Sequence, residues 1–349
     1  HLAAAARRLG PAAQGYSLPP GRTDLRRRIA LAAAAHGCAF GPDEVLVTAG
    51  ATQGLGLALD AVTRPGDVVA VESPAYFGTL MVLERLGLSA LEIPIDPLTG
   101  LDPEVLAAAI ARRAVAAVVA SPTVHNPTGA IMPLAARRRL VELLAARRVP
   151  LIEDDVYGDL AEAPRPPPAK AFDRDGGVIL VSSVSKTLAP GWRLGWIAPG
   201  RWLEAVATRR FADSWAGSPQ TEAALAAHLA SGDHERHLRR LRAALAHSRR
   251  AIAARIETAF PKGTRVAEPA AGLLLWVELP DGVDALELHA RALAEGIGVS
   301  PGQLFSAGGD HGRHIRLNAA NRITPALLRA IDRLAALTRD LAEAGPKTL

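Results

Sequence analysis

Short, almost wholly apolar runs recur along most of the chain, and longer segments rich in Ala, Leu and Arg separate them. The clearest of these runs read AAVVA (116–120), PLIED (150–154) and VILVS (178–182). A strand with one wet face would alternate apolar and polar residues, so these runs indicate strands that are buried on both faces. The pattern therefore predicts an α/β fold in which a mostly parallel sheet lies between helices.

The same periodicity gives an order of elements. We expect strands at 45–48, 68–72, 90–95, 116–120, 150–154, 178–182 and 194–198, and helices at 24–36, 52–62, 76–86, 103–113, 134–147 and 202–211. A long helical region near 219–257 precedes alternating strands at 272–279 and 313–318, which helices near 284–295 and 324–343 flank. This ending predicts a smaller α+β domain.

The composition excludes several classes of protein. The net charge is +5, but the arginines form short groups at helical spacing without interleaved aromatics, which favours solvated helix faces over a nucleic-acid stripe. Cys38 is the one cysteine, so neither a disulfide framework nor a multi-cysteine metal site is possible, and we expect no metal. No apolar run reaches the ~18 residues of a membrane span, and no signal peptide is visible. We expect a cytoplasmic protein.

Polar and aromatic residues follow the predicted strands at the edge where ligands gather in an open α/β sheet. The first strand leads into a small-residue turn with Ala51 and Thr52, whose free N–H groups suit a phosphate at a helix N-terminus. Tyr76 follows the second strand, where it could stack on a flat ring or simply pack in a core. Asn126 lies in an Asn-Pro-Thr-Gly turn after the fourth strand.

Acids and a lysine follow the next two strands. Three consecutive acids, which include Asp154, end one buried strand, and this is costly unless a cation meets them. Lys186 follows the other strand among serines, although the chain has only four lysines among its 40 Lys and Arg residues. An amine, unlike a guanidinium, can lose its proton and form an imine with an aldehyde. An exposed loop lysine is the alternative if Lys186 is considered alone.

Five strand ends thus supply a phosphate cradle, a ring to stack on, an amide, a carboxylate with a tyrosine, and a lysine with serine and arginine. Pyridoxal 5′-phosphate is the ligand that matches this set, because it needs an imine-forming lysine and a carboxylate at its ring nitrogen. It also needs donors to its 3-oxygen and an anion site for its phosphate.

The chain resembles the class I/II aminotransferases, which are fold-type I pyridoxal-phosphate enzymes, over essentially its whole length. The matching motifs are Asn-Pro-Thr-Gly from Asn126, Asp-Asp-Val-Tyr from Asp154, and Ser-Val-Ser-Lys from Ser183. The resemblance implies an aspartate aminotransferase-like fold, with a large domain at 41–255 and an N-terminal arm and small domain at 1–40 and 256–349, in one unit of 1–349.

The resemblance also implies roles for individual residues. Lys186 resembles the lysine that binds the cofactor as an imine and moves the substrate proton, and Asp154 the partner of the pyridine nitrogen. Tyr157 and Asn126 resemble the partners of the 3-oxygen, and Tyr76 the stacking ring. The implied phosphate site consists of Ala51, Thr52, Ser183 and Arg193.

Two further residues carry expectations about the ligand and the assembly. Arg316 resembles the arginine that grips a substrate α-carboxylate, and a planar guanidinium suits that bidentate task; the resemblance also implies that Asn126 contributes to substrate binding. Tyr16 resembles the tyrosine that reaches the phosphate of a neighbouring subunit, which implies a homodimer.

A finer resemblance is to the aminotransferase-like domain of MocR-type regulators in the GntR family. Its phrases are Val-Glu-Ser-Pro-Ala-Tyr-Phe-Gly (71–78), Ile-Glu-Asp-Asp-Val-Tyr-Gly (152–158) and Ser-Lys-Thr-Leu-Ala-Pro-Gly (185–191). These regulators carry an N-terminal winged helix-turn-helix. A start at His1 without methionine, inside a helix, leads us to expect such a domain upstream, through which the parent protein would bind DNA.

Three functions stay open at this point. The chain could transaminate an amino acid, it could use the same chemistry to sense an amino acid or amine for a transcription factor, or it could be a lyase or decarboxylase on the same scaffold. Arg316 supports an amino acid-like ligand in all three, so it does not separate them.

Overall fold

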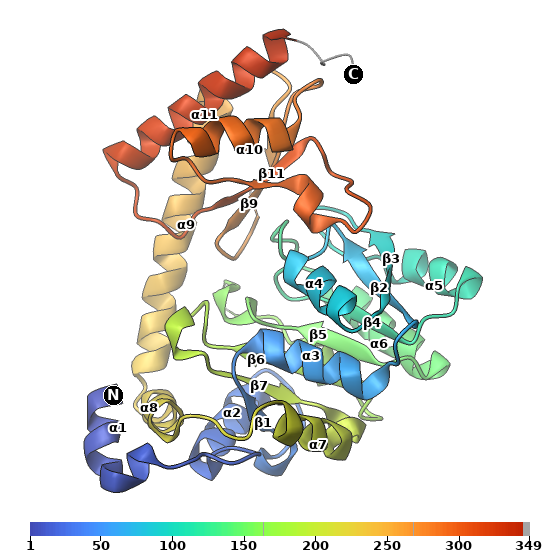
Figure 1. Cartoon of the computed structure of the whole chain (residues 1–349), viewed down its shortest axis with the longest axis vertical. Coiled ribbons are helices and arrows are strands. Elements are labelled where there is room, and N and C mark those ends of the chain that lie inside the picture. The colour runs from blue at the N-terminus through green and yellow to red at the C-terminus, as the bar shows by residue number, and fades with distance from the viewer. Residues whose placement is uncertain (163, 268, 345–349) are drawn as a thin grey trace.

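The computed structural model describes residues 1–162, 164–267 and 269–344. It contains a large sheet and a small sheet, and the long helix α9 (Asp233–Ala259) extends past both of them (Figure 1). Each of the strands and helices predicted before residue 212 has a counterpart whose ends differ by at most two residues. Among the described helices, none is both long enough and apolar enough to cross a bilayer.

The large sheet has the strand order β1-β7-β6-β5-β4-β2-β3. Its strands are β1 (Leu46–Thr48), β2 (Val68–Ser73), β3 (Ser89–Pro94), β4 (Ala117–Ala120), β5 (Leu151–Asp154), β6 (Val178–Ser183) and β7 (Gly195–Ala198). The pairs β3·β2, β2·β4, β4·β5 and β5·β6 are parallel, whereas β7 runs antiparallel to both of its neighbours. The prediction of a mostly parallel sheet is confirmed.

Helices cover both faces of this sheet, as the apolar runs predicted. One face packs against α3 (Ala51–Val62), α4 (Phe77–Arg85) and α7 (Leu203–Asp213). The other face packs against α5 (Pro103–Arg112) and α6 (Leu134–Arg147) at one end, and against α2 (Thr23–Ala34) and α8 (Pro219–Ala230) at the other end. Successive strand residues serve opposite faces: Val69 and Val71 lie in the first core and Ala70 in the second.

The small sheet is antiparallel, with the order β10-β11-β9-β8. Its strands are β8 (Arg265–Ala267), β9 (Leu274–Glu278), β10 (Ser300–Pro301) and β11 (His314–Asn318). They share an apolar core with the C-terminal half of α9, with α10 (Ala285–Ala294) and with α11 (Pro325–Ala344). The predicted α+β ending is therefore present, and only the short strands β8 and β10 were not foreseen.

The expected long helical region at 219–257 is two helices, which corrects the sequence interpretation. The chain leaves α8 at Ala230, and Gly232 adopts a left-handed conformation with φ of 71° before α9 begins. Glycine takes this conformation without the steric cost that a side chain incurs, so the direction of the chain changes there. Near this junction α8 packs on the N-terminal helix α1 (Leu2–Leu9) (Figure 1).

Candidate functional site

The carboxyl ends of the parallel strands meet at one edge of the large sheet and surround a cavity. Because β7 is antiparallel, its beginning lies at this same edge, and Arg193 just before it reaches the cavity. The cavity is lined by Ala51, Thr52, Leu55, Tyr76, Asn126, Asp154, Val156, Tyr157, Ser183, Ser185, Lys186, Pro190 and Arg193. The structure thus brings nine of the predicted site residues together, while their roles stay predictions.

Lys186 faces the open cavity, with its Nζ 5.7 Å from the centre of the Tyr157 ring. Desolvation lowers the pKa of its ammonium group, the positive charge of Arg316 lowers it further, and Asp154 partly opposes the shift. A lowered pKa increases the neutral fraction of an amine, and the neutral amine is the form that reacts with a carbonyl group.

Asp154 ends β5 at the floor of the cavity and has an unusual pKa. Desolvation raises the pKa of its carboxyl group to about 6, and the neighbouring charge of Asp155 adds to the shift. The backbone N–H of Val156 donates to its Oδ1 at 3.1 Å, and this contact favours the carboxylate. A carboxylate with so little solvation gains most from a cationic N–H in front of it.

The N-terminus of α3 opens onto the cavity beside Arg193. The helix begins at Ala51 after Gly50, whose φ of 92° disfavours any other residue. A Cβ at Gly50 would lie 2.8 Å from Nη2 of Arg193, so the guanidinium fills the space that glycine leaves free. The unpaired N–H groups of the first helical turn, the hydroxyls of Ser183 and Ser185, and Arg193 together suit a phosphate dianion.

Arg316 projects from β11 of the small sheet to the site in the large one. Its Nη1 donates to Oδ1 of Asn126 and its Nη2 donates to Oγ of Ser300, both at 3.2 Å. Its guanidinium carbon lies 5.0 Å from the ring centre of Phe305 and 5.8 Å from that of Phe77. The planar group is therefore held in one orientation, as bidentate binding of a carboxylate requires. Ser300 and the two rings were not anticipated from the sequence.

The loop after β10 is fastened to the large sheet next to this arginine. The carboxylate of Glu92 accepts hydrogen bonds from the Ser73 and Ser306 hydroxyls and from the backbone N–H groups of 307 and 308. The backbone N–H of Ala75, beside the predicted stacking ring, donates to the carbonyl of Phe305 at 2.7 Å. These contacts join the two sheets at the cavity, and no local sequence pattern predicts them.

The two acids on either side of Asp154 have separate partners of their own. Glu153 accepts hydrogen bonds from the backbone N–H groups of Ala169 and Lys170. Asp155 pairs with Arg165, which also binds Asp159. Arg165 is thus the cation that meets this group of acids. It lies in a proline-rich stretch that the sequence predicts to be a surface loop, yet its side chain is only 10% exposed.

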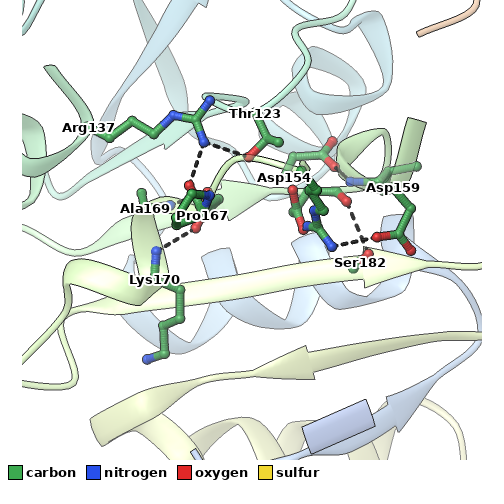
Figure 2. Close-up of polar contacts among 12 residues, drawn as sticks. Thr123, Arg137, Asp154, Asp159, Pro167, Ala169, Lys170 and Ser182 are labelled. Atoms are coloured by element: carbon green, nitrogen blue, oxygen red, sulfur yellow. Dashed lines mark hydrogen bonds and ion pairs between the residues drawn. The ribbon is translucent and has the colours of Figure 1, made fainter. Parts of the chain in front are cut away.

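Another buried arginine fastens the same stretch from the other side. Arg137 donates to the carbonyl of Pro167 at 2.5 Å and to the Thr123 hydroxyl at 3.4 Å, close to the Asn-Pro-Thr-Gly turn (Figure 2). The sequence pattern had assigned the grouped arginines to solvated helix faces, but the side chain of Arg137 is fully buried. That assignment is wrong for Arg137, because its buried guanidinium donates to the backbone carbonyls of Met132 and Pro167.

A buried Glu72–His125 pair supports the Asn126 turn and was also missed. Glu72 Oε2 lies 3.4 Å from His125 Nε2 and accepts a hydrogen bond from the Ser121 N–H at 2.8 Å. Burial raises the pKa of Glu72 to about 8 and lowers that of His125 to about 3. Both shifts favour a neutral pair at pH 7.

Tyr16 lies outside this cavity and is 79% exposed. The adjacent Ser17 pairs with Gly217, which holds the N-terminal arm against the segment before α8. The expected contact of Tyr16 with a second subunit stays a prediction.

The residues fit pyridoxal phosphate at each point that the structure can test. A glycine leaves room for Arg193 at the anion site, a desolvated carboxylate faces the cavity, and the lysine opposite has a lowered pKa. Gly78 is part of the same fit, because a Cβ there would lie 2.5 Å from the Tyr76 ring, so the ring settles over the helix start.

Comparison with known proteins gives one consistent family. A sequence profile described as aminotransferase class I and II matches residues 1–334. The chain is 38% identical to the uncharacterized HTH-type transcriptional regulator YjiR of Escherichia coli over 88% of its own length and 65% of the regulator. It is 30% identical to the 2-aminoadipate transaminase of Thermus thermophilus over 94% of its length and 82% of the enzyme. The chain thus spans just under two thirds of the regulator.

The fold agrees with solved structures of this type. The α-aminoadipate aminotransferase LysN of Thermus thermophilus, complexed with N-(5′-phosphopyridoxyl)-L-leucine, superposes with a TM-score of 0.91 at 27% identity. The match covers 98% of this chain and 89% of LysN.

Proposed function

Because this chain belongs to the family of class I and II aminotransferases, we propose that it binds an α-amino acid-like ligand and either transaminates or senses it. Its cofactor is pyridoxal 5′-phosphate. When bound, this cofactor supplies an aldehyde that condenses with amines and a ring that withdraws electrons from the ligand's Cα. The chain's own residues hold the two partners and move the proton.

The cofactor would be held from three sides. Ser183, Arg193 and the first turn of α3 would bind the phosphate, since their N–H and O–H groups converge there. Asp154 would keep the ring nitrogen protonated, and its own pKa would fall once that cation satisfies it. Tyr157 and Asn126 would donate to the 3-oxygen, and Tyr76 would stack on the ring.

Lys186 and Arg316 would act on the amino acid. Arg316 would bind the α-carboxylate bidentately in the orientation that Asn126 and Ser300 already impose. The ligand's Cα would then lie on the cavity side of the arginine, toward Lys186. The lysine, with its lowered pKa, would then accept the Cα proton and return it elsewhere, as a general base and acid.

We propose further that the chain is the effector domain of a MocR/GntR-type transcriptional regulator. The observation that carries this is the 38% identity to YjiR, which exceeds the 30% identity to the transaminase. About a third of the regulator lies outside the match, which leaves room for a DNA-binding domain. Such a regulator acts on DNA, so the proposal includes a cytoplasmic location. The second candidate is a free-standing aminotransferase, favoured by the 82% coverage of the transaminase.

We also propose a homodimer in which Tyr16 of each copy completes the other copy's phosphate site. Its 79% exposure, and its position outside the lining of its own chain's cavity, support this role. Tyr16→Phe should weaken cofactor binding in the dimer without changing the mass measured by light scattering. Unchanged cofactor affinity would remove Tyr16 from the site.

The test of the chemistry uses the absorbance of the lysine-bound cofactor. Lys186→Ala should abolish that band, whereas Lys262→Ala, at an exposed position, should keep it. An amino acid should change the band of the unmodified protein, and a keto acid should restore it if transamination occurs. A change that no keto acid reverses supports sensing, and no response to any amino acid refutes both functions.

The test of the regulatory assignment is independent of that chemistry. The open reading frame that contains His1 either encodes a helix-turn-helix domain upstream or it does not. Its absence would leave the free-standing aminotransferase.

A further inference from the structure

A second cavity lies back to back with the Lys186 cavity, on the other face of the large sheet. Its volume is about 330 Å³, within the range of small-molecule sites. Asp154, Ser183 and Ser185 line the Lys186 cavity, whereas their neighbours Asp155, Ser182 and Val184 line the second one. This alternation follows from strand geometry, in which successive side chains point to opposite faces. One layer of backbone therefore separates the two cavities.

The second cavity exists because the helix that covers it is built of small residues. On the α2 side its wall consists largely of alanines 32, 33 and 35, which do not reach the sheet. Trp196 of β7 and Leu180 of β6 form an apolar floor, and Leu229 and Leu238 of α8 and α9 contribute from above. This wall is suited to the apolar body of a small molecule.

The side chains around the cavity carry more negative than positive charge. Asp155, Asp159 and Glu235 line it, against Arg165 and Arg242. The guanidinium of Arg165 is already bound to both aspartates, and Nε of Arg242 donates to the backbone carbonyl of Asp159. Glu235 at the exposed end has no ion pair with any residue in the described part of the chain. The formal balance of these five side chains is one negative charge.

The two histidines of the lining do not cancel this charge. Desolvation lowers the pKa of both His36 and His234, and for His36 the positive charge of Arg165 lowers it further. They are therefore neutral at pH 7. The Asp155 carboxylate is bound to Arg165 and only 4% exposed, so the acids open to a ligand are those nearer the mouth.

We propose that this second cavity is a binding site for a small organic cation with an apolar body. The ammonium group would lie toward Asp159 and Glu235, at the mouth, where a carboxylate is free of ion pairs. The apolar body would lie over Trp196, whose ring face also attracts cations. No residue lines both cavities, so a ligand of the second cavity does not compete with the cofactor for its binding residues.

Occupancy of the second cavity affects the first through shared strand ends. A cation in the second cavity raises the positive potential at Asp154, because Asp154 follows the sheet edge that the two cavities share and its neighbour Asp155 lines the second cavity. His237 of α9, one turn from His234 in the cavity wall, lies 2.5 Å from the carbonyl of Thr187, which follows Lys186. The positive potential disfavours protonation of the lysine-bound cofactor. The pH at which its absorbance changes should therefore move downward when the second cavity is filled.

The test is titration calorimetry of the cofactor-loaded protein with benzyltrimethylammonium, a quaternary ammonium that forms no imine at Lys186. Benzoate, which carries the same ring and the opposite charge, is the matched control ligand. Ala32→Trp closes the mouth from an exposed helix position, so folding should tolerate it, and circular dichroism checks this. Glu235→Gln removes the free charge, and Glu204→Gln, an exposed acid of α7, is its control.

We expect saturable binding of one benzyltrimethylammonium per chain and much weaker binding of benzoate. Ala32→Trp should weaken binding of the cation at least about tenfold, which corresponds to about 1.4 kcal/mol. Glu235→Gln should weaken it several-fold, whereas Glu204→Gln and Arg316→Ala should leave it unchanged.

Three results would overturn the proposal: no saturable binding of the cation, tighter binding of benzoate, or binding that Ala32→Trp leaves unchanged. The last result would place the ligand outside the second cavity. Calorimetry measures binding in the second cavity whether or not the cofactor is bound. This test therefore stays valid even if the proposed function is refuted.

Discussion

Replacement of Arg165 by methionine should destabilise the protein strongly, because it breaks a buried ionic cluster. The guanidinium is 10% exposed and pairs with Asp155, which is 4% exposed, and with Asp159. Methionine keeps much of the side-chain volume but leaves the Asp155 carboxylate without its cation. Removal of one partner of a buried pair costs about 3–5 kcal/mol. For 349 residues this corresponds to a fall of about 4–7 °C in the unfolding midpoint.

The measurement is urea unfolding followed by circular dichroism and by tryptophan fluorescence. Arg139→Met is the control, because Arg139 also pairs with a carboxylate, Glu104, but on the surface, and it should change stability little. The double variant Asp155→Asn with Arg165→Met removes the orphaned charge and should recover part of the loss.

The pH dependence of the Arg165→Met variant has a definite sign. Burial raises the pKa of Asp155, and the attraction of Arg165 opposes that rise, so loss of the arginine raises the pKa further. An acid whose pKa is higher in the folded state stabilises the protein at low pH and loses that contribution as the pH rises. The free energy of unfolding of the variant should therefore fall furthest below that of the unmodified protein near neutral pH. The difference between the two free energies should narrow toward about pH 4. A loss below about 1 kcal/mol, or one independent of pH, would refute the reasoning.

Three further outcomes follow from the site. Gly50→Ala should push Arg193 from the anion site and weaken cofactor binding roughly ten- to a hundredfold in equilibrium dialysis. Gly191→Ala, where a Cβ meets open space, should not do so. Arg316→Ala should weaken amino acid binding by a similar factor in absorbance titrations while the cofactor stays bound. Glu72 has a pKa raised to about 8, so the free energy of unfolding should fall as the pH rises from about 4.5 to 8, and Glu72→Gln should flatten that fall; an unchanged slope would mean that Glu72 is already ionised.

Much of the fold could be read from the amino-acid order, since local patterns carry it. Runs that are apolar on every residue admit only strands with two covered faces, and such strands with helical segments between them give a parallel sheet. Parallel strands end at one edge, so the residues that follow them had to meet. This is why Lys186, Asp154 and Asn126 could be grouped before any coordinates were known.

Register and packing between distant segments could not be read in this way. The sequence offers three acids in a row, and only the alternation along β5 decides that Asp154 faces the lysine while Asp155 faces the second cavity. Arg165 reads as an exposed loop residue, because the cost of its burial is offset by carboxylates ten and six residues away in sequence. The burial of Arg137 could likewise not be predicted from the composition of its helix.

The sequence by itself determined the mostly parallel sheet, its covering helices and many of the residues that follow the strands into the Lys186 cavity, because each depends on neighbours along the chain. The tertiary structure alone decided that β7 reverses direction and delivers Arg193 to the cavity. It also decided that Arg316 meets Asn126, 190 residues earlier, across two sheets. These contacts depend on how separately folded elements dock, and docking is fixed by shape and burial over the whole molecule rather than by any local pattern.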